Sequence, residues 1–172
     1  MLRKKKTLRG LTLMEALLFL GLAAIVIVGA FALYNNASST SRLNQAKSQL
    51  QTYISGIKSL YSTRNNFTSV TTSLVVNSGI APAEAVDGAA LINPWGGLTT
   101  ISANSAQPRQ FRVTFEDIPR DACTAMLSAG LIKQGIVYQI GVGATLRSVD
   151  IDPSVAIGLC GSSANDVLFV AR

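Results

Sequence analysis

The chain has 172 residues, enough for one folded domain with an appendage, and 48% of them are hydrophobic although only 6% are aromatic. It contains no histidine, which excludes Ser-His-Asp and Cys-His catalysis and removes the commonest ligand of transition metals. The formal net charge is +6, but residues 1–10 hold five basic residues and no acid, and the rest has ten basic and nine acidic residues. Because the basic run adjoins an apolar segment, a nucleic-acid-binding surface is not predicted.

The first 34 residues have the pattern of a leader followed by a membrane segment. Residues 1–10 are the basic leader, and residues 11–34 are apolar, with 19 final residues that carry no charge and could cross a bilayer as a helix. The basic leader would keep the N-terminus in the cytoplasm. A secretory signal cleaved near Ala30 or Ala32 is the alternative, since small residues mark such sites. Glu15 argues against it, because a carboxylate inside an apolar segment is costly and indicates a function.

Beyond residue 34 the sequence becomes polar but keeps an apolar stripe with helical spacing. The stripe is widened by Ile54 and Tyr61 and otherwise consists of Leu43, Ala46, Leu50, Tyr53, Ile57 and Leu60. We therefore predict one helix from Leu11 to Thr63, about 80 Å long at 1.5 Å per residue. Its first half is apolar all round and its second half is amphipathic. The weak points of this helix are its glycines, Gly21, Gly29 and Gly56.

The rest of the chain has the alternating pattern of an antiparallel sheet with short helices between turns. Strands are predicted at Leu98–Ser102, Phe111–Glu116, Ile136–Val142, Leu146–Ile151 and Val167–Ala171. Short helices are predicted at Ala81–Val86, Asp121–Ala129 and Pro153–Leu159. Asp121 is expected to cap the second of these helices and Gly130 to end it. Residues 68–76 (TSVTTSLVV) are predicted to be a loop and residues 92–97 (INPWGG) a turn. The predicted fold class is therefore α+β, with a long helix packed on an antiparallel sheet.

The only two cysteines, Cys123 and Cys160, lie in the part of the chain that would be exported. An even number of cysteines in an oxidising compartment favours one disulfide, and two reduced buried thiols are the alternative. The late aspartates lack the spacing of a calcium loop or a catalytic carboxylate pair, so no metal, cofactor or catalytic site is predicted. These aspartates are Asp121, Asp150, Asp152 and Asp166.

The junction between the leader and the apolar segment carries the most specific motif. Gly10, Leu11, a threonine and Glu15, followed at once by an apolar run, resemble the prepilin peptidase recognition sequence of type IV pilins and related pseudopilins. The resemblance implies cleavage between Gly10 and Leu11 on the cytoplasmic face, with methylation of the new Leu11 amine. Glycine would let the scissile peptide enter a tight protease site. In the filament core, Glu15 would pair with the positive Leu11 amine of an adjacent subunit, as its apolar surroundings favour.

A second resemblance extends loosely over the whole chain and is to type IVb pilins, the subclass of bundle-forming and toxin-coregulated pili. It rests on the residue after the cleavage site, which is not phenylalanine, on INPWGG, and on a cysteine in a late helix (DACTAMLSAG) with another near the C-terminus. In that family the disulfide encloses the D-region, here residues 123–160. The implied organisation is a leader (1–10), an apolar transmembrane and filament-core helix (11–34) and a globular pilin domain (35–172).

The resemblance implies a non-enzymatic structural subunit of an extracellular type IV pilus that supports adhesion, aggregation or conjugation. The expected partners are further copies of the chain, prepilin peptidase and the inner-membrane assembly platform, with no nucleic acid. The precursor would cross the inner membrane once before its incorporation into the pilus. The alternatives are a minor pilin or a type II secretion pseudopilin, and a periplasmic enzyme or binding protein with an uncleaved anchor. Glu15 and the expected disulfide favour the pilin.

Overall fold

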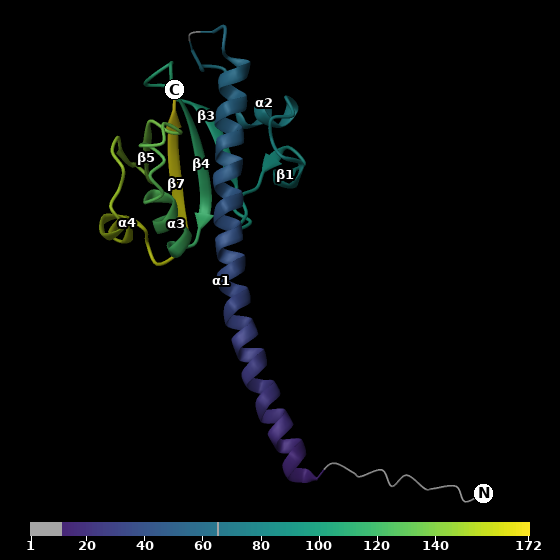
Figure 1. Cartoon of the computed structure of the whole chain (residues 1–172). Helices are drawn as coiled ribbons and strands as arrows, with labels where there is room; N and C mark the ends of the chain where they lie inside the picture. The colour runs from purple at the N-terminus through teal and green to yellow at the C-terminus, as the bar shows by residue number, and fades with distance from the viewer. Residues whose placement is uncertain (1–11, 65) are drawn as a thin grey trace, which may run out of the picture. The chain divides into compact units, whose positions relative to one another are not determined.

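The computed structural model describes residues 12–64 and 66–172 (Figure 1). The chain divides into two compact units, the first ending at Ser39 and the second formed by Thr40–Arg172. The elements are α1 (Leu13–Leu60), α2 (Thr72–Asn77), the 3₁₀ helix η1 (Ala83–Ala85), β1 (Val86–Asp87), β2 (Ala90–Leu91), β3 (Thr99–Ala103), β4 (Phe111–Ile118), α3 (Arg120–Leu127), β5 (Gln139–Val142), β6 (Thr145–Arg147), α4 (Pro153–Leu159) and β7 (Asn165–Ala171).

Helix α1 has 48 residues and confirms the predicted long helix over the described residues, although it ends at Leu60 and is followed by a turn. In its second half the predicted stripe is buried, with Leu50, Tyr53 and Ile57 fully inaccessible. Leu60, at the end of the stripe, stays 48% exposed. Gly56 is a packing position as well as a weak point in the helix. A Cβ there would overlap the side chain of Ile80, so the loop after α2 can approach the helix only at a glycine.

A five-stranded antiparallel sheet, in the order β3-β4-β7-β5-β6, forms the second layer of this unit. The C-terminal strand β7 lies between β4 and β5, as Figure 1 shows in yellow between two green strands. Alternate residues are buried along most of β4 and in the first part of β7, and the last three residues of β7 are all buried. The inward-facing side chains share one hydrophobic core with the stripe of α1. The large aromatic members of the inner face are Phe111, Phe115 and Phe169. This arrangement confirms the predicted α+β class.

Two local predictions before the sheet are wrong. Residues 72–77 form helix α2 and are not a loop, since the side-chain oxygen of Thr71 accepts a hydrogen bond from the Leu74 amide at 3.2 Å and caps the helix. The predicted helix at 81–86 is reduced to the 3₁₀ turn η1, because its last residue, Val86, starts the small β1–β2 hairpin. The INPWGG turn is confirmed. Asn93 organises it by accepting hydrogen bonds from the amides of Trp95 and Gly97.

In the later part of the chain α4 has its predicted bounds, whereas other bounds need correction. Helix α3 begins one residue earlier than predicted, after Pro119, so Asp121 lies in its first turn and is not its N-cap. It ends at Leu127, three residues before Gly130. Strand β5 begins at Gln139, so residues 136–138 are not part of it. Strand β6 ends at Arg147, whereas the predicted strand continued to Ile151. The backbone before β5 turns because Asp150 accepts hydrogen bonds from two successive amides there.

Candidate functional site

The predicted processing and assembly residues lie at the start of α1. Gly10 and Leu11 are outside the described residues, so cleavage of the peptide bond between them stays a prediction. Glu15 lies in the first turn of α1, and its side chain is exposed. The amide of Glu15 donates a hydrogen bond to Oγ1 of Thr12 at 3.3 Å, and the amide of Ala16 donates to the Thr12 carbonyl at 3.0 Å. Thr12 therefore caps the helix.

Thr12 is the threonine of the N-terminal motif, and the sequence analysis did not identify its capping role. Thr12 and Glu15 have the Thr-x-x-Glu spacing of a capping box, and the first half of this motif, the side-chain bond to the third helical amide, is formed. An acidic residue in the first turn also interacts favourably with the positive end of the helix dipole. The signal was readable in the sequence as Thr-x-x-Glu directly before an apolar run. The capping bond uses the backbone amide of Glu15, and its carboxylate lies exposed in the first turn of the helix.

The apolar part of α1 exposes its side chains all round. Every large hydrophobic side chain described from Leu13 to Tyr34 is at least 61% exposed. An 18-residue window of the helix has a mean hydropathy of 2.8 with none of it buried, so by length and composition the helix could cross a membrane. Added Cβ atoms at Gly21 and Gly29 would meet nothing within 4 Å. A contiguous apolar surface of this size requires contact with lipid or with other apolar helices.

The second predicted site is the disulfide-bounded region. The Sγ atoms of Cys123 and Cys160 are 1.99 Å apart, which confirms the predicted disulfide and removes the alternative of two reduced thiols. Cys123 is buried inside α3, and Cys160 is the buried C-cap of α4. The bond therefore ties these two helices together. Between the cysteines the chain forms β5, β6 and α4, so the enclosed region supplies one edge of the sheet.

The enclosed region also contains two of the late aspartates, and both cap backbone turns. Oδ1 of Asp150 accepts hydrogen bonds from the amides of Ile132 and Lys133 at 3.2 and 3.3 Å. Asp152 caps α4, accepting a hydrogen bond from the Ser154 hydroxyl and another from its amide, and these bonds lower the pKa of Asp152. Within the described part of the chain, no group of three or more histidine, cysteine, aspartate or glutamate side chains is placed to hold a metal ion.

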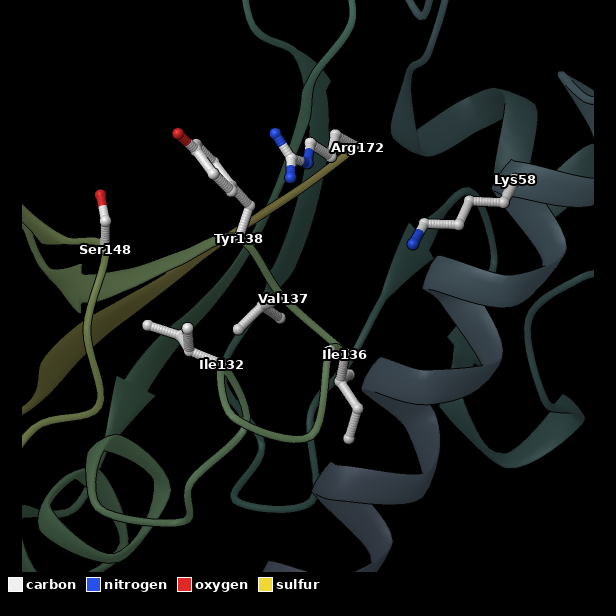
Figure 2. Close-up of a pocket in the computed structure, with 8 residues that line it drawn as sticks. Lys58, Ile132, Ile136, Val137, Tyr138, Ser148 and Arg172 are labelled. Carbon is white, nitrogen blue, oxygen red and sulfur yellow. The ribbon is translucent and has the colours of Figure 1, made fainter.

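Two neighbouring cavities lie at the end of the sheet where β7 finishes. The first cavity has a volume of about 370 Å³. Figure 2 shows residues that line it: Lys58 comes from α1, Tyr138 directly precedes β5, and Arg172 directly follows β7. The guanidinium carbon of Arg172 lies 4.4 Å from the centre of the Tyr138 ring, a cation–π contact that holds the charge at the cavity wall. The second cavity, of about 500 Å³, shares Arg172 and is otherwise lined by Arg64, Phe67, Gln107, Arg109 and Gln110. Among the lining residues the charged side chains are all cations, an arrangement suited to receiving an anion.

Comparison with known proteins gives a consistent result. Residues 40–172 match the family described as PilS N terminal. The major structural subunit of the bundle-forming pilus of Escherichia coli O127:H6 is 26% identical over 141 residues, which are 80% of this chain and 73% of that protein. Two solved structures share the fold: a type IV b pilin from Salmonella typhi (TM-score 0.54, 18% identity, 72% of this chain and 97% of that one), and TcpA, a type IV pilin from Vibrio cholerae El Tor biotype (TM-score 0.56, 16% identity, 77% and 99%). The chain belongs to the PilS N terminal family and has the type IV pilin fold, most like that of the type IVb pilins.

Proposed function

We propose that this chain is a structural, non-enzymatic subunit of a type IV pilus. The observation that carries the proposal is the apolar stretch of α1, whose large side chains are exposed all round, in a chain whose other unit has the pilin fold. Such a surface is stable in a bilayer before assembly and among the apolar helices of other copies afterwards. The relative from Escherichia coli is itself named as a pilus subunit. The precursor would therefore reside in the inner membrane and the mature subunit in an extracellular filament.

Maturation would consist of cleavage between Gly10 and Leu11 by a prepilin peptidase and methylation of the Leu11 amine. Cleavage removes the five cations of residues 1–10, which hold the N-terminus in the cytoplasm. It also creates a positive amine one residue before Thr12, the N-cap of α1. A cation at the positive end of a helix dipole is unfavourable. We therefore infer that this amine forms an ion pair with the Glu15 carboxylate of a neighbouring subunit. The assembly platform would bring the two subunits together.

The capping and pairing roles of Glu15 can be separated by substitution. Glu15→Gln keeps a side chain that can complete the capping box but removes the charge, whereas Glu15→Ala removes both. If the carboxylate pairs with Leu11, both variants should be processed normally and fail to form filaments. If capping alone matters, Glu15→Gln should assemble like the unsubstituted chain and only Glu15→Ala should fail. The readouts are the amount of filament sheared from cells and the fraction of subunit that is processed.

Intact mass and N-terminal sequencing of sheared filaments test the proposed function directly. The expected major protein begins with N-methylated Leu11. A mature chain that begins after Ala32 would instead indicate conventional signal-peptide cleavage and would overturn the proposal. A trace component of filaments built from another subunit would indicate a minor pilin, and its absence from all surface filaments would favour a secretion pseudopilin.

A further inference from the structure

The antiparallel pairing of β4 with β7 places opposite charges at opposite ends of the sheet. In this pairing Phe111 lies opposite Ala171 at one end, and Ile118 lies opposite Asn165 at the other. The first end carries basic residues that come from the segments next to these strands and from α1 and the turn after it. The second end carries acidic residues of β4 and β7 together with one cation, Arg120, whose guanidinium donates a hydrogen bond to the Ile157 carbonyl at 3.3 Å. The two ends are separated by the 8 residues of β4, roughly 26 Å of strand. We call them the basic end (Lys58, Arg64, Arg109 and Arg172) and the acidic end (Glu116, Asp117 and Asp166).

The basic end is hollowed and its charges are held in place. Arg172 contributes to both cavities and is fixed by its contact with the Tyr138 ring. Lys58 reaches the first cavity from the last turn of α1, and Figure 2 shows its amine directed toward the side of the cavity that Tyr138 and Arg172 line. The exposed Arg109 lines the second cavity. Both rings near these charges are already in contact with the protein, Tyr138 with Arg172 and Phe67 with Tyr61 and Phe111, so stacking on a nucleic-acid base is not favoured.

The acidic end brings carboxylates from both strands to one corner. A bulge interrupts the β4–β7 register after Phe115, and Asp117 adopts a positive φ of 57° there. The amide of Asp117 donates a hydrogen bond to Oδ1 of Asp166 at 3.4 Å, which holds the two exposed aspartates near each other. Glu116 adjoins them and is half-buried. Like charges held this close favour the approach of a cation.

We propose that the basic end of one copy receives the acidic end of the next copy, an inference that rests on the proposed pilus function. Two different patches at opposite ends of one unit make a heterologous contact, which propagates as an open polymer and does not close as a dimer. Exposed charge pairs contribute little affinity but direct approach and register, whereas the apolar helix supplies the affinity. An acidic polysaccharide is the other occupant that this chemistry fits, and the test separates the two.

The test is a charge swap in cells that assemble the full chain. Arg109→Glu changes the basic end and Glu116→Lys changes the acidic end. Asp87→Lys, at an exposed position of β1 in the small hairpin, makes the same charge change as Glu116→Lys outside both ends and is the control. Asp166→Lys is made in parallel, in case the half-buried Glu116 tolerates lysine poorly. Each single reversal should lower the yield of sheared filaments about fivefold at equal subunit level, the equivalent of an exposed charge pair of ~1 kcal/mol. The double variant Arg109→Glu with an acidic-end reversal should recover to within about twofold of the unsubstituted chain, and the control should not change.

Each remaining outcome decides the inference. Single reversals that assemble normally, or a double variant no better than the singles, would overturn it while leaving the pilus function intact. Failure of the unsubstituted chain to form filaments would remove the proposed function and this inference with it. Alginate, a uronate polymer, is added to purified pili as the competing ligand. If alginate binds and Arg109→Glu abolishes that binding without changing the filament yield, the basic end is a polysaccharide site and not a subunit contact.

Discussion

Removal of the Cys123–Cys160 disulfide should lower the free energy of unfolding of the pilin domain by about 4 kcal/mol. The bond closes a segment of 37 residues. For a loop of that length, the chain-entropy model gives a loss of about 13 cal/mol/K in the unfolded state, or roughly 4 kcal/mol at 25 °C. Both cysteines are buried between α3 and α4, whose packing would persist without the bond, so the effect arises mainly in the unfolded chain. Domains of this size are typically stable by only about 5–15 kcal/mol.

The measurement is urea denaturation of a chain that begins at residue 35, with the disulfide intact, reduced, or replaced in Cys123→Ala/Cys160→Ala. The reduced and doubly substituted proteins should unfold at similar, lower urea concentrations. In the urea-unfolded chain, thiol reagent should label neither cysteine while the disulfide is intact and both after reduction. If reduction changes the free energy of unfolding by less than about 1 kcal/mol, the enclosed segment must already be constrained in the unfolded state, and the entropic argument fails.

Three further results are expected from the same truncated chain. It should be a monomer by size exclusion, because the exposed apolar surface of residues 13–34 is removed; polymers would show that the globular unit alone holds the filament contacts. Tyr53→Phe should stabilise it by about 1 kcal/mol, because the buried hydroxyl has no hydrogen-bond partner among the described residues. Burial, with the charge of Glu84, raises the pKa of Tyr53 from 10.0 to about 12, so stability should fall as pH rises through this window, and less so in the variant. A destabilised Tyr53→Phe would contradict the first statement, and an equal loss of stability with pH in both proteins would contradict the second. Gly141→Ala should destabilise by about 1–3 kcal/mol, since its Cβ would overlap the Thr145 carbonyl. Gly158→Ala is the control: it has open space around it and lies inside α4, so it should stabilise by up to about 1 kcal/mol.

The features that the sequence alone determined are those encoded by local spacing. The apolar run and the stripe that follows it repeat at helical intervals, so one long helix was predictable from a single period. Helix α4 was predicted with its observed bounds because Asp152 as cap and Pro153 as first residue are adjacent signals. Having only two cysteines made Cys123 and Cys160 the only available pair. The candidate assembly residues Gly10, Leu11 and Glu15 likewise came from one short motif, and the same motif contains the Thr-x-x-Glu spacing of the capping residue Thr12, whose hydrogen bond the structure shows.

The tertiary structure decided everything that depends on residues far apart in the chain. No local pattern places the last strand, β7, between β4 and β5, because strand order depends on which pairings bury the most apolar surface together. The close packing of Ile80 on Gly56 joins two elements whose sequences are independent of each other. The two charged ends also depend on long-range pairing. Arg109 and Arg172 are 63 residues apart in the sequence, and they line the same cavity because β4 and β7 run antiparallel. Long-range pairing, and not local propensity, therefore created the two charged ends.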